Sequence, residues 1–102
     1  MEQITVQELK ERLDKGEKLN LIDVREPAEY EEYNIGAQLI PLGKIRNMET
    51  EEIDHLKKEE LIIHCRSGAR SAQACMLLES MGFANTKNVE GGVLAWIQHF
   101  GR

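Results

Sequence analysis

The chain has 102 residues and a formal net charge of −5 at neutral pH, and 41% of its residues are hydrophobic. This length is enough for one domain with a single core but not for two, so we expect residues 1–102 to form one domain. The acidic balance excludes general binding to nucleic acid, because phosphate binding requires a basic face.

The first five residues lack the basic and apolar segments of a signal peptide. No stretch of the sequence is long and apolar enough to suggest a membrane span. We therefore expect a cytoplasmic protein that does not insert into membranes.

Helical and extended patterns alternate along the chain. A capping-box signature at residues 5–8 opens the first predicted helix, and glycine or proline residues mark most of the other boundaries. The predicted helices cover residues 6–15, 27–33, 71–81 and 93–100. The predicted strands cover residues 19–24, part of 35–41, 61–64 and 86–89, and residues 43–60 are polar with weak helical segments. Strands separated by helices predict an α/β fold with a mainly parallel sheet.

A cysteine stands between the predicted strand 61–64 and a predicted helix that begins at Ser71. If Ser71 opens that helix, the backbone N–H groups of residues 66–71 lack intrahelical partners and can converge on an anionic sulfur. The charges of Arg66 and Arg70 add to this effect, so we expect Cys65 to be an ionised nucleophile at neutral pH. Most lone cysteines are inert and buried, but the polar residues that follow Cys65 would be costly to bury without partners.

Three charged residues follow the predicted strand 19–24 or lie in the short helix after it. In a parallel sheet, ligands bind at the carboxyl ends of the strands, where Asp23, Arg25 and Cys65 all lie. Asp23 and Arg25 could therefore act in catalysis. The favoured interpretation is that they pair with Glu29 and brace the loop and the short helix.

The second cysteine, Cys75, shares a helical stripe with apolar residues, namely Ala74, Leu78 and Met81. This spacing predicts core packing rather than the role of a resolving thiol. The three histidines are scattered and show no metal-ligand spacing, so we predict no metal and no other cofactor. The acidic run at residues 49–60 is typical of a solvated face, although it could also bind a basic partner.

Four segments carry recognisable motifs, in the order DVREPAEY at 23–30, IGAQLIP at 35–41, CRSGARS at 65–71 and VEGGVLAW at 89–96. Together they resemble the single-domain rhodaneses, the thiosulfate sulfurtransferase family, over nearly the whole chain. Two positions depart from the family pattern. Asn34 stands where the family often has histidine, and Leu39 where it often has a polar residue.

The resemblance implies a rhodanese-like three-layer sandwich in which helices flank a mainly parallel, five-stranded sheet. It also implies a sulfurtransferase in which the Cys65 thiolate takes the sulfane sulfur of thiosulfate or a related persulfide donor. The resulting Cys65 persulfide would pass its sulfur to cyanide or a thiol. Backbone N–H groups of the loop would hold the persulfide charge, and Arg70 and Arg66 would bind the anionic end of the donor. The substrate-binding residues are thus Arg66, Ser67, Gly68, Ala69 and Arg70. The implied partners are a small anionic sulfur donor and a thiol or cyanide acceptor, and the resemblance also allows a protein persulfide as a partner.

Two other functions stay open from the residues alone. Cysteine phosphatases and arsenate reductases of related fold use a loop with five residues between cysteine and arginine, whereas four separate Cys65 from Arg70. The shorter loop favours a sulfur atom over a tetrahedral oxyanion. A non-catalytic, rhodanese-like binding module is the third alternative, but such modules often lack the cysteine.

Overall fold

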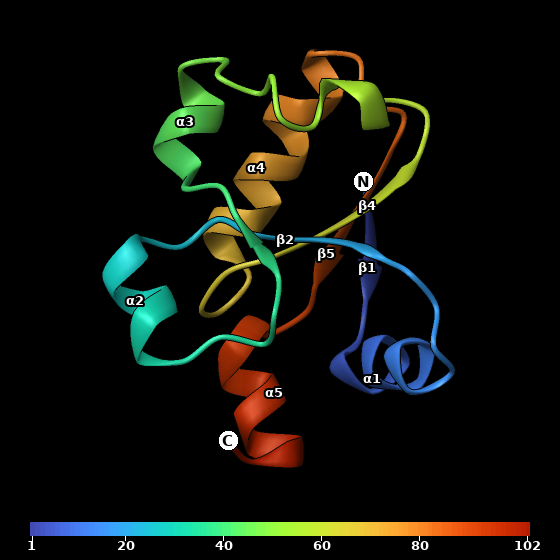
Figure 1. Cartoon of the computed structure of the whole chain (residues 1–102), viewed down its shortest axis with the longest axis vertical. Coiled ribbons are helices and arrows are strands. Elements are labelled where there is room, and N and C mark those ends of the chain that lie inside the picture. The colour runs from blue at the N-terminus through green and yellow to red at the C-terminus, as the bar shows by residue number, and fades with distance from the viewer.

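The computed structural model describes residues 1–102 and contains one five-stranded sheet with helices on both faces (Figure 1). The strands are β1 (Glu2–Ile4), β2 (Asn20–Asp23), β3 (Gln38–Leu39), β4 (Glu60–His64) and β5 (Asn85–Val89). Their order in the sheet is β1-β5-β4-β2-β3, and every neighbouring pair is parallel. The predicted α/β class and parallel five-stranded sheet are therefore confirmed.

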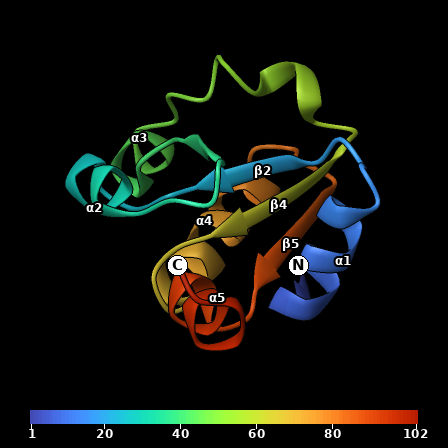
Figure 2. The same ribbon diagram turned by 60° about the horizontal axis from the view of Figure 1, so that its bottom comes forward.

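Helices connect the strands and cover the sheet on both faces, which gives the predicted three layers (Figures 1 and 2). They are α1 (Val6–Asp14), α2 (Pro27–Glu32), α3 (Leu42–Arg46), α4 (Ala69–Ser80) and α5 (Gly92–Phe100), with a 3-10 helix, η1, at Asp54–Leu56. In Figure 1, α3 and α4 lie above the sheet, and α1 and α5 lie below it.

Successive side chains of β4 enter two separate hydrophobic cores. Leu61 and Ile63 pack with residues of α3 and α4, such as Leu78, whereas Ile62 packs with residues of α1, such as Leu9. Side chains alternate between the two faces of a strand, and both faces of this sheet are covered by helices. This explains why the three middle residues of β4, Leu61 to Ile63, are all apolar.

The helix after Cys65 begins earlier than the sequence predicts. It starts at Ala69 rather than at Ser71, and Gly68 caps it with a positive φ of 105°. Alanine and arginine are both good helix formers, and glycine alone adopts this φ at little cost, so the helix extends back to the glycine. Ser71 therefore lies inside the first turn, facing back toward Cys65. The other predicted elements match the structure to within one or two residues at each end.

The sequence pattern does not predict the fifth strand, β1. It has only three residues and buries a single side chain, Ile4. Its position depends on pairing with β5, in which Gln3 aligns with Asn88 and Ile4 with Val89. Such a short edge strand has no alternation of its own for a sequence pattern to detect.

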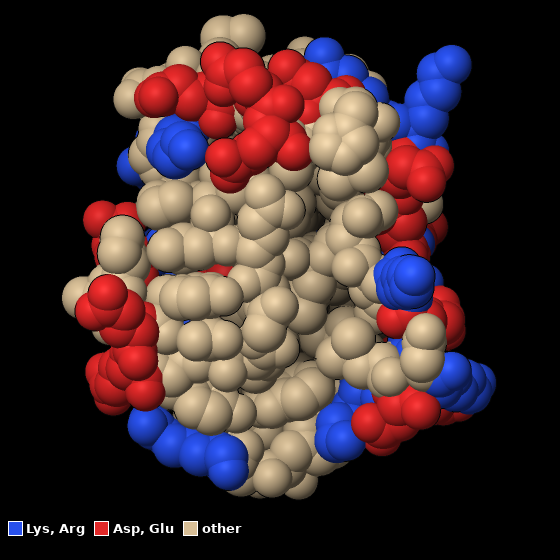
Figure 3. Space-filling view, viewed as in Figure 1, with Lys and Arg blue, Asp and Glu red and all other residues tan.

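Surface charge is distributed unevenly. Acidic side chains gather at the top of the face in Figure 3, above a broad area without charged groups. Glu49, Glu51, Glu52 and Asp54 of the predicted acidic run are all exposed, which confirms the expectation of a solvated face. None of the helices reaches the length and apolarity that a membrane-spanning helix needs.

Candidate active site

Cys65 follows the last residue of β4, at the edge of the sheet where β2 also ends. Within this edge, Asp23 of β2 aligns with His64 of β4. The Cys65 side chain is 1% exposed, and its sulfur lies within a ring of donors. The backbone N–H groups of Gly68 and Ser71 donate to Sγ at 3.1 and 3.3 Å, and the Ser71 hydroxyl lies 3.3 Å from Sγ. The loop thus surrounds the sulfur with hydrogen-bond donors, as its sequence predicts.

These donors determine the acidity of the thiol. Burial opposes ionisation of Cys65, but the Ser71 hydroxyl and the backbone N–H groups of Ser71, Gly68 and Ser67 favour the thiolate. Their combined effect places the pKa of Cys65 below its ordinary value. Hydrogen bonds to a charged form favour that form, and the N-terminus of α4 supplies them without a formal charge.

The first turn of α5 holds the loop from the other side. The N–H of Val93 donates to the carbonyl of Cys65, and the N–H of Leu94 donates to the carbonyl of Arg66, both at 3.0 Å. This close approach requires Gly92, because a Cβ at that position would lie 2.4 Å from the Cys65 carbonyl oxygen. The double glycine before α5 therefore positions the backbone of the nucleophile.

A buried polar chain runs from the sulfur toward β1. The Ser71 hydroxyl makes a short hydrogen bond to Oδ1 of Asn88, and Nδ2 of Asn88 donates to Gln3 and to the Gly68 carbonyl. Ser71 is 0% exposed and Asn88 is 4% exposed. Nothing in the local sequence pattern marks Asn88, because its role depends on the pairing of strands that are distant in sequence.

The predicted bracing residues form two separate ion pairs. The Arg25 guanidinium binds the Asp23 carboxylate at 2.8 Å and also donates to the carbonyl of Tyr33. The expectation that Glu29 joins that pair is wrong. Glu29 instead binds Arg70 in two hydrogen bonds of 2.7 and 2.9 Å. Because Glu29 projects from α2 and Arg70 from the first turn of α4, the second pair joins α2 to the loop. The Arg70 bond holds the pKa of Glu29 at about 2.

Arg66 and Arg70 therefore differ in what they can offer to a substrate. The Arg70 side chain is occupied by Glu29. Arg66 is exposed and makes no side-chain hydrogen bond or ion pair. Of the remaining loop residues, Ser67 and Ala69 are exposed and Gly68 is half-buried. Of these two guanidinium groups, only that of Arg66 is free to pair with an anion.

A buried histidine directly precedes the nucleophile. Nδ1 of His64 lies 3.3 Å from the Cys65 carbonyl, and Nε2 lies 3.6 Å from the Asp23 carboxylate without a hydrogen-bond partner. Burial lowers the pKa of His64, which keeps the ring neutral near neutral pH. His64 thus packs beneath the site without adding a charge to it.

Cys75 lies in a different environment from Cys65. It is 0% exposed and belongs to the core cluster formed with Ala74 and Leu78, which confirms the predicted packing role. Burial raises the pKa of its thiol to about 11. The two cysteines are free, so the structure contains no disulfide.

Comparison with known proteins assigns this arrangement to a family. Residues 5–99 match the family model of the rhodanese-like domain. The chain belongs to the rhodanese-like domain family. Among solved structures, this rhodanese-like domain is similar to a rhodanese-like domain protein from Staphylococcus aureus, with a TM-score of 0.82 and 36% identity. The match covers 94% of this chain and 91% of that one.

Two curated relatives show sequence similarity to this rhodanese-like domain over most of its length. A protein named sulfurtransferase from Allochromatium vinosum is 38% identical over 98 residues, which are 95% of this chain and 89% of the relative. The probable adenylyltransferase/sulfurtransferase MoeZ of Mycobacterium tuberculosis is 40% identical over 95 residues. These residues are 91% of this chain but only 24% of MoeZ, so the rhodanese-like domain spans about a quarter of that protein.

Proposed function

We propose that the chain is a sulfurtransferase in which Cys65 carries a sulfane sulfur as a persulfide. The donor is thiosulfate or a related persulfide, and the acceptor is a thiol or cyanide. The observation that carries the proposal is the ring of donors around Sγ, formed by the N–H groups of Gly68 and Ser71. Family membership and a relative named sulfurtransferase support the same reaction class. Free cysteines stay reduced in a reducing compartment, which fits a cytoplasmic location.

The reaction consists of two displacements at sulfur. In the first, the Cys65 thiolate attacks the outer sulfur of thiosulfate, a Cys65 S–S bond forms, and the S–S bond of thiosulfate breaks to release sulfite. In the second, cyanide attacks the outer sulfur of the Cys65 persulfide, which releases thiocyanate and restores the thiolate. Charge balances in both steps, and neither requires an oxidant or a reductant. The backbone N–H groups of the loop stabilise the anionic sulfur on both sides of the cycle.

The loop geometry favours sulfur over phosphate. The N–H groups of Gly68 and Ser71 lie 3.1 and 3.3 Å from Sγ, so the loop encloses one sulfur atom closely and leaves no room for a phosphate group between these donors and Sγ. The terminal sulfur of thiosulfate projects on a single bond and needs much less room. The four-residue spacing between Cys65 and Arg70 agrees with this preference. We expect no phosphatase activity comparable to sulfur transfer.

Intact-protein mass spectrometry tests the proposal. Incubation with thiosulfate should add one sulfur, about 32 Da, to the wild type, and cyanide should remove it and form thiocyanate. Cys65→Ala should gain no sulfur, whereas the matched Cys75→Ala variant should gain it normally. A wild-type protein that stays unmodified by thiosulfate and by inorganic polysulfide would refute the proposed function.

A further inference from the structure

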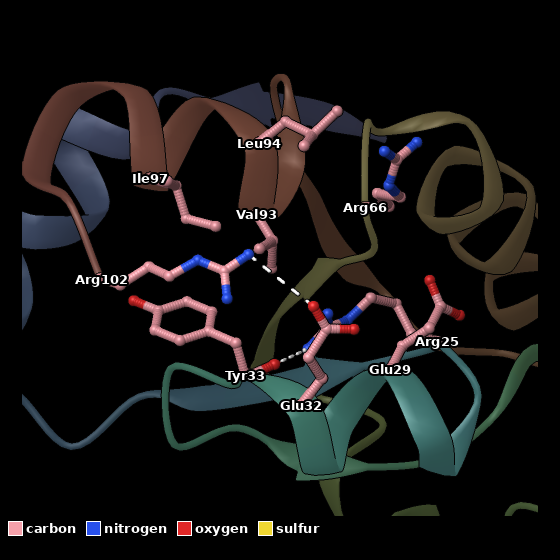
Figure 4. A pocket seen from close by; sticks show the side chains of 9 residues that line it. All are labelled: Arg25, Glu29, Glu32, Tyr33, Arg66, Val93, Leu94, Ile97 and Arg102. Atoms are coloured by element: carbon pink, nitrogen blue, oxygen red, sulfur yellow. Dashed lines mark hydrogen bonds and ion pairs between the residues drawn. The ribbon is translucent and has the colours of Figure 1, made fainter.

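A pocket opens between α2 and α5 beside the Cys65 loop (Figure 4). We call it the α2–α5 pocket. The residues that matter to its chemistry are Tyr33, Arg66, Val93, Leu94, Ile97 and Arg102. Two of these residues are directly connected to Cys65. Arg66 follows it in the chain, and the N–H of Val93 donates a hydrogen bond to the Cys65 carbonyl. A ligand in this pocket therefore lies beside the backbone of the Cys65 loop.

The charged groups around the α2–α5 pocket leave it receptive to an anion. Arg25 also lines it, but the buried Asp23 carboxylate neutralises that guanidinium. The carboxylate of Glu29 is likewise taken by Arg70. Arg66 has no partner, so its charge is available to a ligand, in a chain whose net charge is −5.

The far end of the pocket carries a second guanidinium that is only loosely held. Arg102 contacts Glu32 at 3.9 Å, and both side chains are more than half exposed. Its guanidinium also lies over the Tyr33 ring, 5.4 Å from the ring centroid. Exposed pairs of this kind contribute little, so Arg102 can move aside for a ligand.

The wall that α5 presents to the pocket is apolar. Figure 4 shows Val93 and Ile97 facing the α2 side of the pocket, while Leu94 lies at the end near Arg66. Leu94 is 45% exposed although it is a large hydrophobic residue. An inorganic anion such as thiosulfate has no carbon atoms to cover this wall, whereas an organic ligand does.

These features point to the organic partner of the reaction. We propose that the α2–α5 pocket binds the sulfur acceptor, and that this acceptor is an organic thiol with a carboxylate and an apolar group. The carboxylate pairs with Arg66, and the apolar group packs on the wall formed by Leu94 and Ile97. The thiol then faces the Cys65 persulfide and takes its outer sulfur, which leaves the Cys65 thiolate and a new persulfide on the acceptor. This inference rests on the proposed sulfurtransferase function.

Matched acceptors separate the two contacts. Wild-type protein is first loaded with sulfur from thiosulfate, and its persulfide sulfur is then transferred to N-acetylcysteine or to the neutral amide of N-acetylcysteine. The kcat/KM values for the two acceptors are compared at equal concentrations of acceptor thiolate. We expect the carboxylate to be preferred about fivefold, as for one exposed ion pair. Arg66→Gln should reduce this preference to near one, whereas Arg46→Gln, which removes the same charge from α3, should keep it. Loss of rate with both acceptors alike in Arg66→Gln, or no preference in the wild type, would overturn the proposal.

The apolar wall is tested in the same way. N-hexanoylcysteine should be preferred over N-acetylcysteine by the wild type, because its longer chain buries more surface on α5. Leu94→Gln should reduce that preference several-fold. Met76→Gln, at another exposed apolar position on α4, should leave it unchanged. An equal preference in wild type and Leu94→Gln would contradict packing on this wall.

A binding experiment keeps the pocket testable even if no sulfur is transferred. N-hexanoylglycine carries the carboxylate and the carbon chain but no thiol, so its binding does not depend on chemistry at Cys65. In an NMR titration it should shift the backbone amide signals of Leu94 and Ile97 in the wild type, and much less in Arg66→Gln. Absence of these shifts would refute the pocket, while failure of sulfur loading alone would refute only the proposed function.

Discussion

The two cysteines of this chain are both buried, yet their thiols have opposite properties. Cys65 is 1% exposed with a lowered pKa, whereas Cys75 is 0% exposed with a pKa raised to about 11. Cys65 lies just before α4, where backbone N–H groups have no helical partners, and Cys75 lies within the helix, among apolar side chains. Burial alone would make both thiols inert. The free N–H groups at the helix start make the difference.

The largest expected effect is the difference between two single variants, Cys65→Ala and Cys75→Ala. Cys65→Ala should abolish thiocyanate formation, since no other thiol is both ionised and next to the loop. Cys75→Ala should retain turnover and lose about 1 kcal/mol of stability, because it removes one buried sulfur from the core. The measurements are steady-state thiocyanate production and denaturant unfolding. Loss of turnover in a folded Cys75→Ala protein would contradict the distinction between the two sites.

Substitution of Gly92, which positions the backbone of Cys65, should also lower the activity of Cys65. Gly92→Ala places a Cβ against the Cys65 carbonyl and forces an L residue into a φ of 55°, so α5 must shift away from the loop. We expect roughly a hundredfold loss of turnover, as is typical when a reacting group moves by about 1 Å. Gly43→Ala is the control, because a Cβ there meets nothing within 4 Å. Equal activity of the two variants would show that α5 does not position the nucleophile.

The Ser71 hydroxyl should make a smaller contribution to the reactivity of Cys65. Ser71→Ala removes the hydroxyl, whose single proton is shared between the sulfur and Oδ1 of Asn88, but keeps the backbone N–H groups, so the pKa of Cys65 should rise. Alkylation of Cys65 by iodoacetamide at neutral pH should slow roughly fivefold, the effect of about 1 kcal/mol. Peptide mass spectrometry measures this rate, and the buried Cys75 in the same sample should stay unmodified as long as the protein is folded. An unchanged rate would mean that the hydroxyl donates only to Asn88.

The smallest effect concerns the ion pair between Glu29 and Arg70. The Arg70 hydrogen bonds hold the pKa of Glu29 at about 2 in the folded state, against 4.5 without such bonds. A lowered folded-state pKa gives stability that is present above about pH 4.5 and is lost as pH falls toward 2. Because both side chains are about one-third exposed, the contribution is only about 1 kcal/mol.

Glu29→Gln should therefore lower the unfolding free energy at pH 7 and flatten its acid dependence. Glu60→Gln is the matched variant, since the Arg12 hydrogen bonds also hold the pKa of Glu60 at about 2, far from the loop. Both variants should lose stability in urea unfolding, but only Glu29→Gln should also change the rate of sulfur loading. Equal rates of sulfur loading in both variants would show that the Glu29–Arg70 ion pair does not affect the active site.

The sequence predicts the nucleophile and its hydrogen-bond donors better than it predicts the residues that hold the loop in place. The motif from Cys65 to Ser71 is local, so one strand, one glycine and one helix start are enough to place the donors around the sulfur. Asn88 and Gln3 could not be found in this way, because they meet Ser71 only through the pairing of β1 with β5. The sequence also pairs Glu29 with the wrong residues, since the orientation of α2 and α4, and not sequence spacing, brings Glu29 to Arg70.

The most direct test of this account is a pH titration of the Cys65 thiol in the Cys75→Ala variant, followed by thiolate absorbance in the ultraviolet. We expect a single ionisation below the ordinary range of free cysteine, because the N–H groups of Gly68 and Ser71 stabilise the anionic sulfur. Cys65→Ala, which retains Cys75, should show ionisation only near pH 11. A Cys65 thiol that ionises at or above the ordinary value would contradict the claim that the loop prepares a thiolate.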